Sequence, residues 1–165
     1  MDAGARVYEQ AGSVYGCASG IGGSHRLGSS GFTLRGPRIE MARVAGRIAA
    51  YGMSSPGVDT GYATVEVRRL SDGRLLARRP ATTTAGVEGF ESVDAIVVRS
   101  DGAVAWIATA RSIGSPRFVR QLQALDRRGL RLLDAGRALV PTSLRLRGST
   151  LSWRHGASIR TAPLA

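Results

Sequence analysis

Three carboxylates lie close together in the chain, at Glu88, Glu91 and Asp94, and they are the side chains best suited to chemistry. Hard cations such as Ca²⁺ prefer carboxylate oxygens, and paired carboxylates can serve as general acid and general base. A calcium loop has ligands at alternate positions around a central glycine, and this segment does not. We therefore interpret the three as partners for neighbouring arginines and expect no metal and no cofactor. An enzyme with an acidic site stays open as an alternative.

A second group combines soft ligands, Cys17, Met53 and His155, each placed two residues after an aromatic residue. Thiol, thioether and imidazole together suit Cu(I). The three would meet only if repeated elements surrounded a shared axis, so filling of the core is the simpler interpretation. Cys17 is the only cysteine, which excludes an intramolecular disulfide, and neither histidine belongs to a motif of cysteine nucleophiles.

Arginine is the third chemically active residue type, and it crowds one hairpin at Arg68, Arg69, Arg74, Arg78 and Arg79. All 23 basic residues are arginine, and the net charge is +11. The absence of lysine is typical of a genome rich in G and C, and most arginines are dispersed and alternate with apolar residues, as in 144–147. Solvated strand faces explain this pattern, which argues against a nucleic-acid partner. An Arg-rich binder of anionic polymers remains an alternative function, and charge at a sheet edge also discourages association.

The elements that must position these residues are β-hairpins. Gly46 and Gly73 lie 27 residues apart, as do Gly102 and Gly129, and each glycine separates two strand-like runs. Helical periodicity is nearly absent. A hairpin pair repeated at one spacing predicts an all-β fold of antiparallel blade repeats. We expect one domain over 1–165, small, about four-bladed and β-propeller-like, incomplete or open, with units at roughly 6–35, 39–80, 94–134 and 143–164.

The second strand of each unit carries an aromatic residue at a matching place, and we expect these side chains to pack between adjacent sheets. They are Tyr15, Tyr51, Trp106 and Trp153.

One end of such a molecule carries tight turns and the other carries long loops, among them those expected over 53–62, 80–94, 110–117 and 134–142. Long loops on a rigid scaffold often recognise ligands, so we predict a binding face there. Its polar and aromatic members are Arg35, Arg38, Asp59, Tyr62, Glu88, Phe90, Glu91, Arg111 and Arg117. The partner would be a protein, a small molecule or a glycan, and open blade edges would also allow a homodimer.

Residues 100–136 resemble the TolB-like, WD40-like β-propeller repeat. The matching residues, in order, are Asp101, Gly102, Trp106, Asp126, Gly129, Arg131, Leu132 and Gly136, although the proline of the family's turn is missing. A second stretch, 46–73, is similar. The resemblance covers about half the chain well, and the whole chain resembles secreted actinobacterial proteins built from such blades. It implies a non-catalytic binding or structural module outside the cytoplasm.

Composition fits a single globular domain. The chain has 165 residues, of which 43% are hydrophobic, and this length allows a sizeable core. No apolar run approaches the roughly 18 residues of a membrane span. The N-terminus lacks the basic start and apolar centre of a signal peptide. Either the protein is cytosolic or an initiating Met has replaced its leader, so an extracytoplasmic location rests on the resemblance alone.

Overall fold

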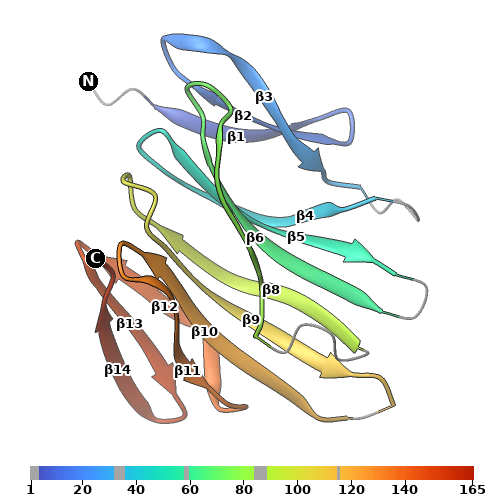
Figure 1. Ribbon diagram of the computed structural model, residues 1–165, viewed down its shortest axis with the longest axis vertical. Helices are drawn as coiled ribbons and strands as arrows, with labels where there is room; N and C mark the ends of the chain where they lie inside the picture. The colour runs from blue at the N-terminus through green and yellow to red at the C-terminus, as the bar shows by residue number, and fades with distance from the viewer. Residues whose placement is uncertain (1–3, 32–35, 58–59, 84–88, 115) are drawn as a thin grey trace.

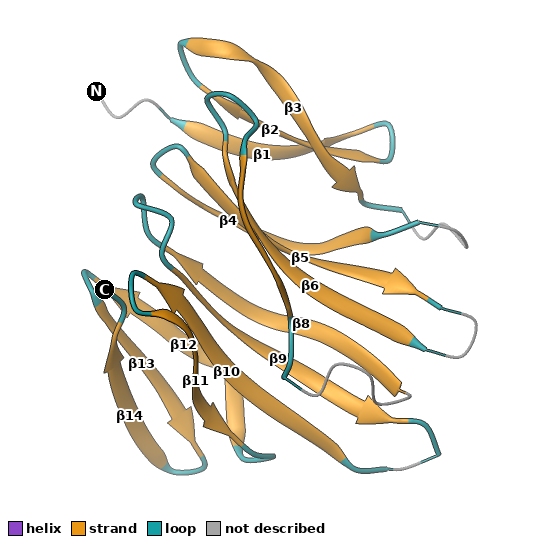
Figure 2. Ribbon diagram, in the orientation of Figure 1, coloured by secondary structure: helices purple, strands orange, loops and turns teal. Residues whose placement is uncertain are grey.

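The computed structural model describes residues 4–31, 36–57, 60–83, 89–114 and 116–165. These residues form β-strands and connecting turns and contain no helix (Figures 1 and 2). The prediction of an all-β protein is therefore confirmed.

Fourteen strands form four consecutive antiparallel groups. The first group contains β1 (Ala5–Gln10), β2 (Ser13–Ala18) and β3 (Ile21–Ser29). The second contains β4 (Arg38–Ala45), β5 (Ile48–Pro56), β6 (Gly61–Arg69) and β7 (Leu75–Pro80). The third contains β8 (Gly89–Val98), β9 (Val104–Ser112), β10 (Phe118–Asp126) and β11 (Gly129–Ala135). The fourth contains β12 (Leu139–Arg147), β13 (Thr150–His155) and β14 (Ser158–Pro163).

The groups follow one another along the longest axis of the molecule, from the first at the top of Figure 1 to the fourth at the bottom. Two single parallel pairings, Ser29 with Arg38 and Gly61 with Phe90, link the first three groups into one mixed sheet of eleven strands. The fourth group forms a separate sheet, and neither sheet closes on itself.

The four repeat glycines lie at or beside the tight turns that the sequence predicts. Gly46, Gly73, Gly102 and Gly129 all have positive φ, between 56° and 97°. That conformation costs a residue with a Cβ atom more than it costs glycine, which is why glycine recurs at these hairpins.

The core consists of three apolar clusters, one between each pair of consecutive groups. Tyr51 lies between the first and second groups, Trp106 between the second and third, and Trp153 between the third and fourth. The expectation that these second-strand aromatics pack between sheets is confirmed. Tyr15 differs: it is half-buried and stacks on Tyr8, with ring centroids 5.7 Å apart, on the outer side of the first group.

Several strands are longer than the sequence indicates, always at the end opposite the tight turns. The long loops expected over 53–62, 80–94, 110–117 and 134–142 are partly strand, because β5, β6, β8, β9 and β12 extend into them. As a result Tyr62, Phe90, Glu91 and Arg111 lie on strand ends and not in loops, which corrects the prediction.

Candidate functional site

A groove of about 270 Å³ opens between the second and third groups, at the end where long loops were predicted. Its walls come from the start of β4, the end of β5 and the starts of β6 and β8, and they include Arg38, Glu40, Ser54, Pro56, Phe90 and Ser92. We call it the Phe90 groove. A shallower hollow of about 390 Å³ shares Arg38, Glu40 and Ser92 with it.

Phe90 supplies the apolar wall of the groove. Its side chain is 55% exposed, and its ring lies so close to Gly61 that a Cβ atom there would approach the ring to 3.2 Å. Gly61 is thus the residue that lets the ring lie against β6. A large aromatic side chain held in place and left exposed is typical of a recognition site.

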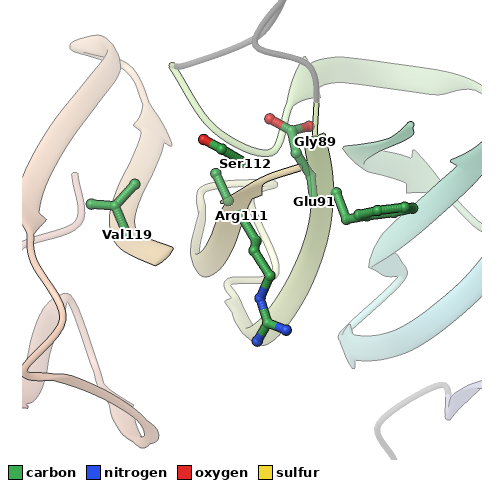
Figure 3. Close-up of a pocket in the computed structure, with 7 residues that line it drawn as sticks. Gly89, Glu91, Arg111, Ser112 and Val119 are labelled. Carbon is green, nitrogen blue, oxygen red and sulfur yellow. The ribbon is translucent and has the colours of Figure 1, made fainter. Parts of the chain in front are cut away.

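Arg111 lies beside Phe90 on the same face of the third group. The two residues are cross-strand partners in β8 and β9, whereas Glu91 pairs with Ala110 on the opposite face. Figure 3 shows the exposed Arg111 side chain directed away from the Glu91 carboxylate. A smaller hollow, of about 80 Å³, is lined by Phe90, Glu91 and Arg111. Phe90 thus lines both hollows, and the exposed guanidinium of Arg111 belongs to the smaller one.

The acidic side chains near the groove accept hydrogen bonds from the protein's own donors. Glu91 accepts from the backbone N–H of Ala63 at 3.0 Å and from the Thr82 hydroxyl. Glu40 accepts from the backbone N–H of Val93 at 3.1 Å and lies 3.6 Å from Arg38. Each of these two carboxylates thus reaches the backbone of a different strand group and holds the second and third groups together at the groove.

Asp94 also has a structural role, since it accepts hydrogen bonds from the hydroxyls of Ser92, at 2.8 Å, and Thr109. The interpretation of the acidic cluster as partners of arginine is not what the structure shows for Glu91 and Asp94, because N–H and hydroxyl groups bind them. Glu88 lies outside the described residues. No metal-binding group of carboxylates, cysteines or histidines occurs in the described part of the chain.

Two β-bulges, one in β4 and one in β8, bend the strands that form the walls of the groove. Glu40 is the extra residue between Ile39 and Met41 in β4, and Asp94 is the extra residue between Val93 and Ala95 in β8. A bulge turns the following side chains to the other face and bends the strand. The loss of alternation at these positions is the one sequence signal that could have located them.

The structure brings only some residues of the predicted binding face together. Arg38, Phe90 and Glu91 line the Phe90 groove, and Arg111 lines the smaller hollow together with Phe90. Tyr62 lies one residue after Gly61 and is 48% exposed. Arg117 lies in the connection between β9 and β10. Arg35, Asp59 and Glu88 lie outside the described residues. Sequence reasoning did not find Glu40, Ser54, Pro56 and Ser92, whose small or commonplace side chains carry no motif.

The arginine-rich hairpin of β6 and β7 is partly neutralised by one buried carboxylate. Glu66 is 1% exposed, accepts a hydrogen bond from Arg78 Nε at 2.6 Å and lies 3.4 Å from Arg68. The Tyr51 hydroxyl donates to the same carboxylate at 2.6 Å. Burial, together with that hydrogen bond, raises the pKa of Tyr51. Arg69 pairs with Asp72 at 3.2 Å. These contacts favour a structural role for Arg68, Arg69 and Arg78.

The three soft ligands lie at different places in the stack. Cys17 faces Arg6 across β1 and β2, and Met53 packs between the first and second groups. His155, at the end of β13 in the fourth group, contacts Asp134 at 3.0 Å. The structure does not bring them together, so the copper-site hypothesis is wrong.

Comparisons with family models, with curated proteins and with solved structures find no match to this chain. In the part of the chain that the structure describes, no helix is long and apolar enough to cross a membrane.

Proposed function

We propose that the protein is a non-catalytic binding module and that the Phe90 groove is its ligand site. The observation that carries this proposal is the exposure of Phe90, 55%, at the wall of a 270 Å³ hollow. Ligand sites are concave, mostly apolar and equipped with a few polar groups that fix orientation. The nearby carboxylates hold strands together, so the groove's role is recognition.

The architecture that we propose for this module is an open, propeller-like array, with each strand group as one blade. The repeated burial of a second-strand aromatic against the preceding group supports it. In such an array the ends of the strands that surround the groove form one rim. Binding residues on a rigid rim lose little conformational entropy when a ligand binds.

The ligand chemistry follows from the two exposed groups. Phe90 offers an apolar surface, and its cross-strand partner Arg111 offers a guanidinium that can pair with a carboxylate, sulfonate or phosphate. We therefore propose that the ligand is an apolar group that carries a negative charge, such as a hydrophobic side chain next to an acidic group of a partner protein, or an aromatic acid.

Anilinonaphthalene sulfonate is a suitable probe because it joins an aromatic ring system to an anion. We expect its fluorescence to rise on binding to the native protein. Phe90→Ala should weaken binding at least tenfold, since burial of such a ring contributes about 1.5–3 kcal/mol. Arg111→Gln should weaken it about threefold, as an exposed ion pair contributes less.

Leu132→Ala is the matched control, because Leu132 on β11 is 50% exposed and distant in sequence from the groove. It should leave binding of the dye unchanged. Thermal unfolding of each variant shows whether the fold persists, since dye binding by a loosened core would mimic a site. Equal affinity of the Phe90→Ala variant and the native protein would disprove the proposed site.

A further inference from the structure

The fourth group has one side that no other strand group covers. Its inner side carries Leu144, Leu151 and Trp153, which are buried against the third group. Strand pairing places alternate side chains on the opposite side, which we call the C-terminal face. Its members include Arg145, Arg147, Thr150, Ser152, Arg154, Ile159 and Thr161.

Among the described residues, no carboxylate lies within ion-pair distance of the three arginines of this face. Of the 19 other described arginines, seven pair with a carboxylate, at distances of 2.5–3.6 Å. Arg147 and Arg154 make no ion pair with any described residue. Arg145 donates to the carbonyl oxygens of Thr142 and Leu144, at 2.7 and 2.9 Å, which orients its guanidinium without cancelling its charge.

Strand register sets the spacing of these charges. Arg145 and Arg147 are two residues apart on β12, about 6.6–6.8 Å along the strand. Arg145 pairs with Ser152 and Arg147 with Thr150, while Arg154 follows Ser152 by two residues on β13. Two guanidinium groups on β12 therefore lie beside two hydroxyl groups on β13, and Arg154 continues the row of β13. This arrangement differs from the hairpin of β6 and β7, where Arg68 and Arg78 bind Glu66 and Arg69 binds Asp72.

We propose that the C-terminal face binds an acidic polysaccharide, a linear polymer of sugars that carry sulfate or carboxylate groups. Guanidinium groups pair bidentately with carboxylates and other planar or branched anions. Hydroxyls of Thr150, Ser152 and Thr161 can exchange hydrogen bonds with sugar hydroxyls. The charge of the surface and the charge of the polymer are complementary, which steers association as well as stabilising the complex.

Other polyanions fit this face less well. Single-stranded nucleic acids are held by aromatic side chains that stack on bases, and the only tryptophan of the fourth group, Trp153, is buried on the inner side. Membrane-surface binding uses several large apolar residues, and Ile159, 74% exposed, is the one exposed large hydrophobic residue on this face.

The test uses the full chain and a size-defined heparin oligosaccharide as the probe, with calorimetry at physiological salt. We expect the triple variant R145Q/R147Q/R154Q to lose about tenfold in affinity, because each exposed ion pair makes a modest contribution. The matched control, R43Q/R74Q/R128Q, removes the same charge from exposed positions in the second and third groups. Its loss should stay below about threefold, the effect of net charge alone.

A single-stranded oligothymidylate with the same number of charges distinguishes the polymer class. Weaker binding of the oligothymidylate than of heparin supports the polysaccharide. Tighter binding that depends on the same three arginines would assign the face to nucleic acid and overturn the proposal. Equal losses in the triple variant and the control would show that only overall charge acts, which also overturns it. Circular dichroism of both variants confirms that they are folded.

Discussion

Individual buried residues in this protein show how the polar atoms of large aromatic side chains are satisfied. Trp106 donates to the backbone carbonyl of Ala81 at 2.8 Å, and Trp153 donates to Asp134 at 2.6 Å. Tyr51 donates to Glu66. A buried donor without an acceptor would lose a hydrogen bond that it makes with water in the unfolded chain. Each interface thus depends on one acceptor that a hydropathy profile does not reveal.

We predict that Glu66→Ala destabilises the protein by about 3 kcal/mol, the usual cost of breaking a buried ion pair. The change leaves the Tyr51 hydroxyl without its acceptor and removes the carboxylate shared by Arg68 and Arg78. Glu66→Gln should cost less, since its amide oxygen can still accept from Tyr51. Urea unfolding measures the difference. Asp72→Ala serves as the control, because its ion pair with Arg69 is exposed, and it should cost below about 1 kcal/mol.

Asp134 makes stability depend on pH. Its burial acts to raise the pKa, but hydrogen bonds from Trp153 and His155 and the charges of His155 and Arg160 outweigh burial and lower the pKa below its ordinary value. A carboxyl with a lowered folded-state pKa stabilises the protein above its unfolded pKa, about 3.9. That contribution is lost as pH falls through the folded pKa.

We therefore expect the stability difference between the native protein and Asp134→Asn to be fully present above about pH 5 and to shrink steadily below about pH 4. Urea unfolding at a series of pH values measures it. A difference that stays constant down to pH 3 would mean that the carboxylate charge does not contribute.

At the scale of the elements, the close approach of neighbouring groups depends on small residues. Gly52 in β5 faces Val93 in β8, and a Cβ atom on Gly52 would lie 2.6 Å from the Val93 Cβ atom. We predict that Gly52→Ala costs about 1–3 kcal/mol through overpacking.

The partner residue gives this prediction a control. Val93→Ala alone should also destabilise, because it removes buried methyl groups. Combined with Gly52→Ala, it should restore part of the lost stability, because the contacts with the two Val93 Cγ atoms at 2.9 and 3.0 Å are removed, although the contact with the Cβ atom remains. Additive losses in a double-mutant cycle would show that the two groups do not pack as described.

Turn glycines and alternation predicted most strands correctly, because both are local properties of the chain. The prediction was wrong at the strand ends near the groove. There the bulges at Glu40 and Asp94 interrupt the alternation of apolar and polar residues. The sequence pattern therefore predicted a loop for strand residues such as Phe90. The groove itself could not be predicted from local sequence, because it forms where strand groups that are distant in sequence meet. The exposure of Phe90 and the role of Glu91 depend on those neighbours and not on local sequence.

At the scale of the whole molecule, the first and fourth strand groups differ in the contacts that attach each of them to its neighbouring group. The fourth group is tied to the third by hydrogen bonds from Arg99 to the Leu164 carbonyl, at 2.5 Å, and from the Ala165 N–H to Asp126, at 2.8 Å. Asp134 adds bonds from Trp153 and Arg160. The first group meets the second through one parallel pairing and an apolar cluster.

This asymmetry predicts that the stack opens from its N-terminal end. In an array of packed repeats, a terminal unit is stabilised by one neighbour only, so its local stability follows the strength of that single interface. The first group supplies three buried residues, Val14, Ala18 and Leu27, to its cluster, whereas residues 139–164 supply five to the cluster shared with the third group. Amide hydrogen exchange measured by mass spectrometry should be fastest in β1–β3, slower in β12–β14 and slowest in β5, β6, β8 and β9.

Weakening the contacts between the third and fourth groups with Asp126→Ala should speed exchange in β12–β14 and leave exchange in β1–β3 unchanged. If β12–β14 exchanged as fast as β1–β3 in the native protein, the hydrogen bonds around Asp126 and Asp134 would not stabilise this end of the stack.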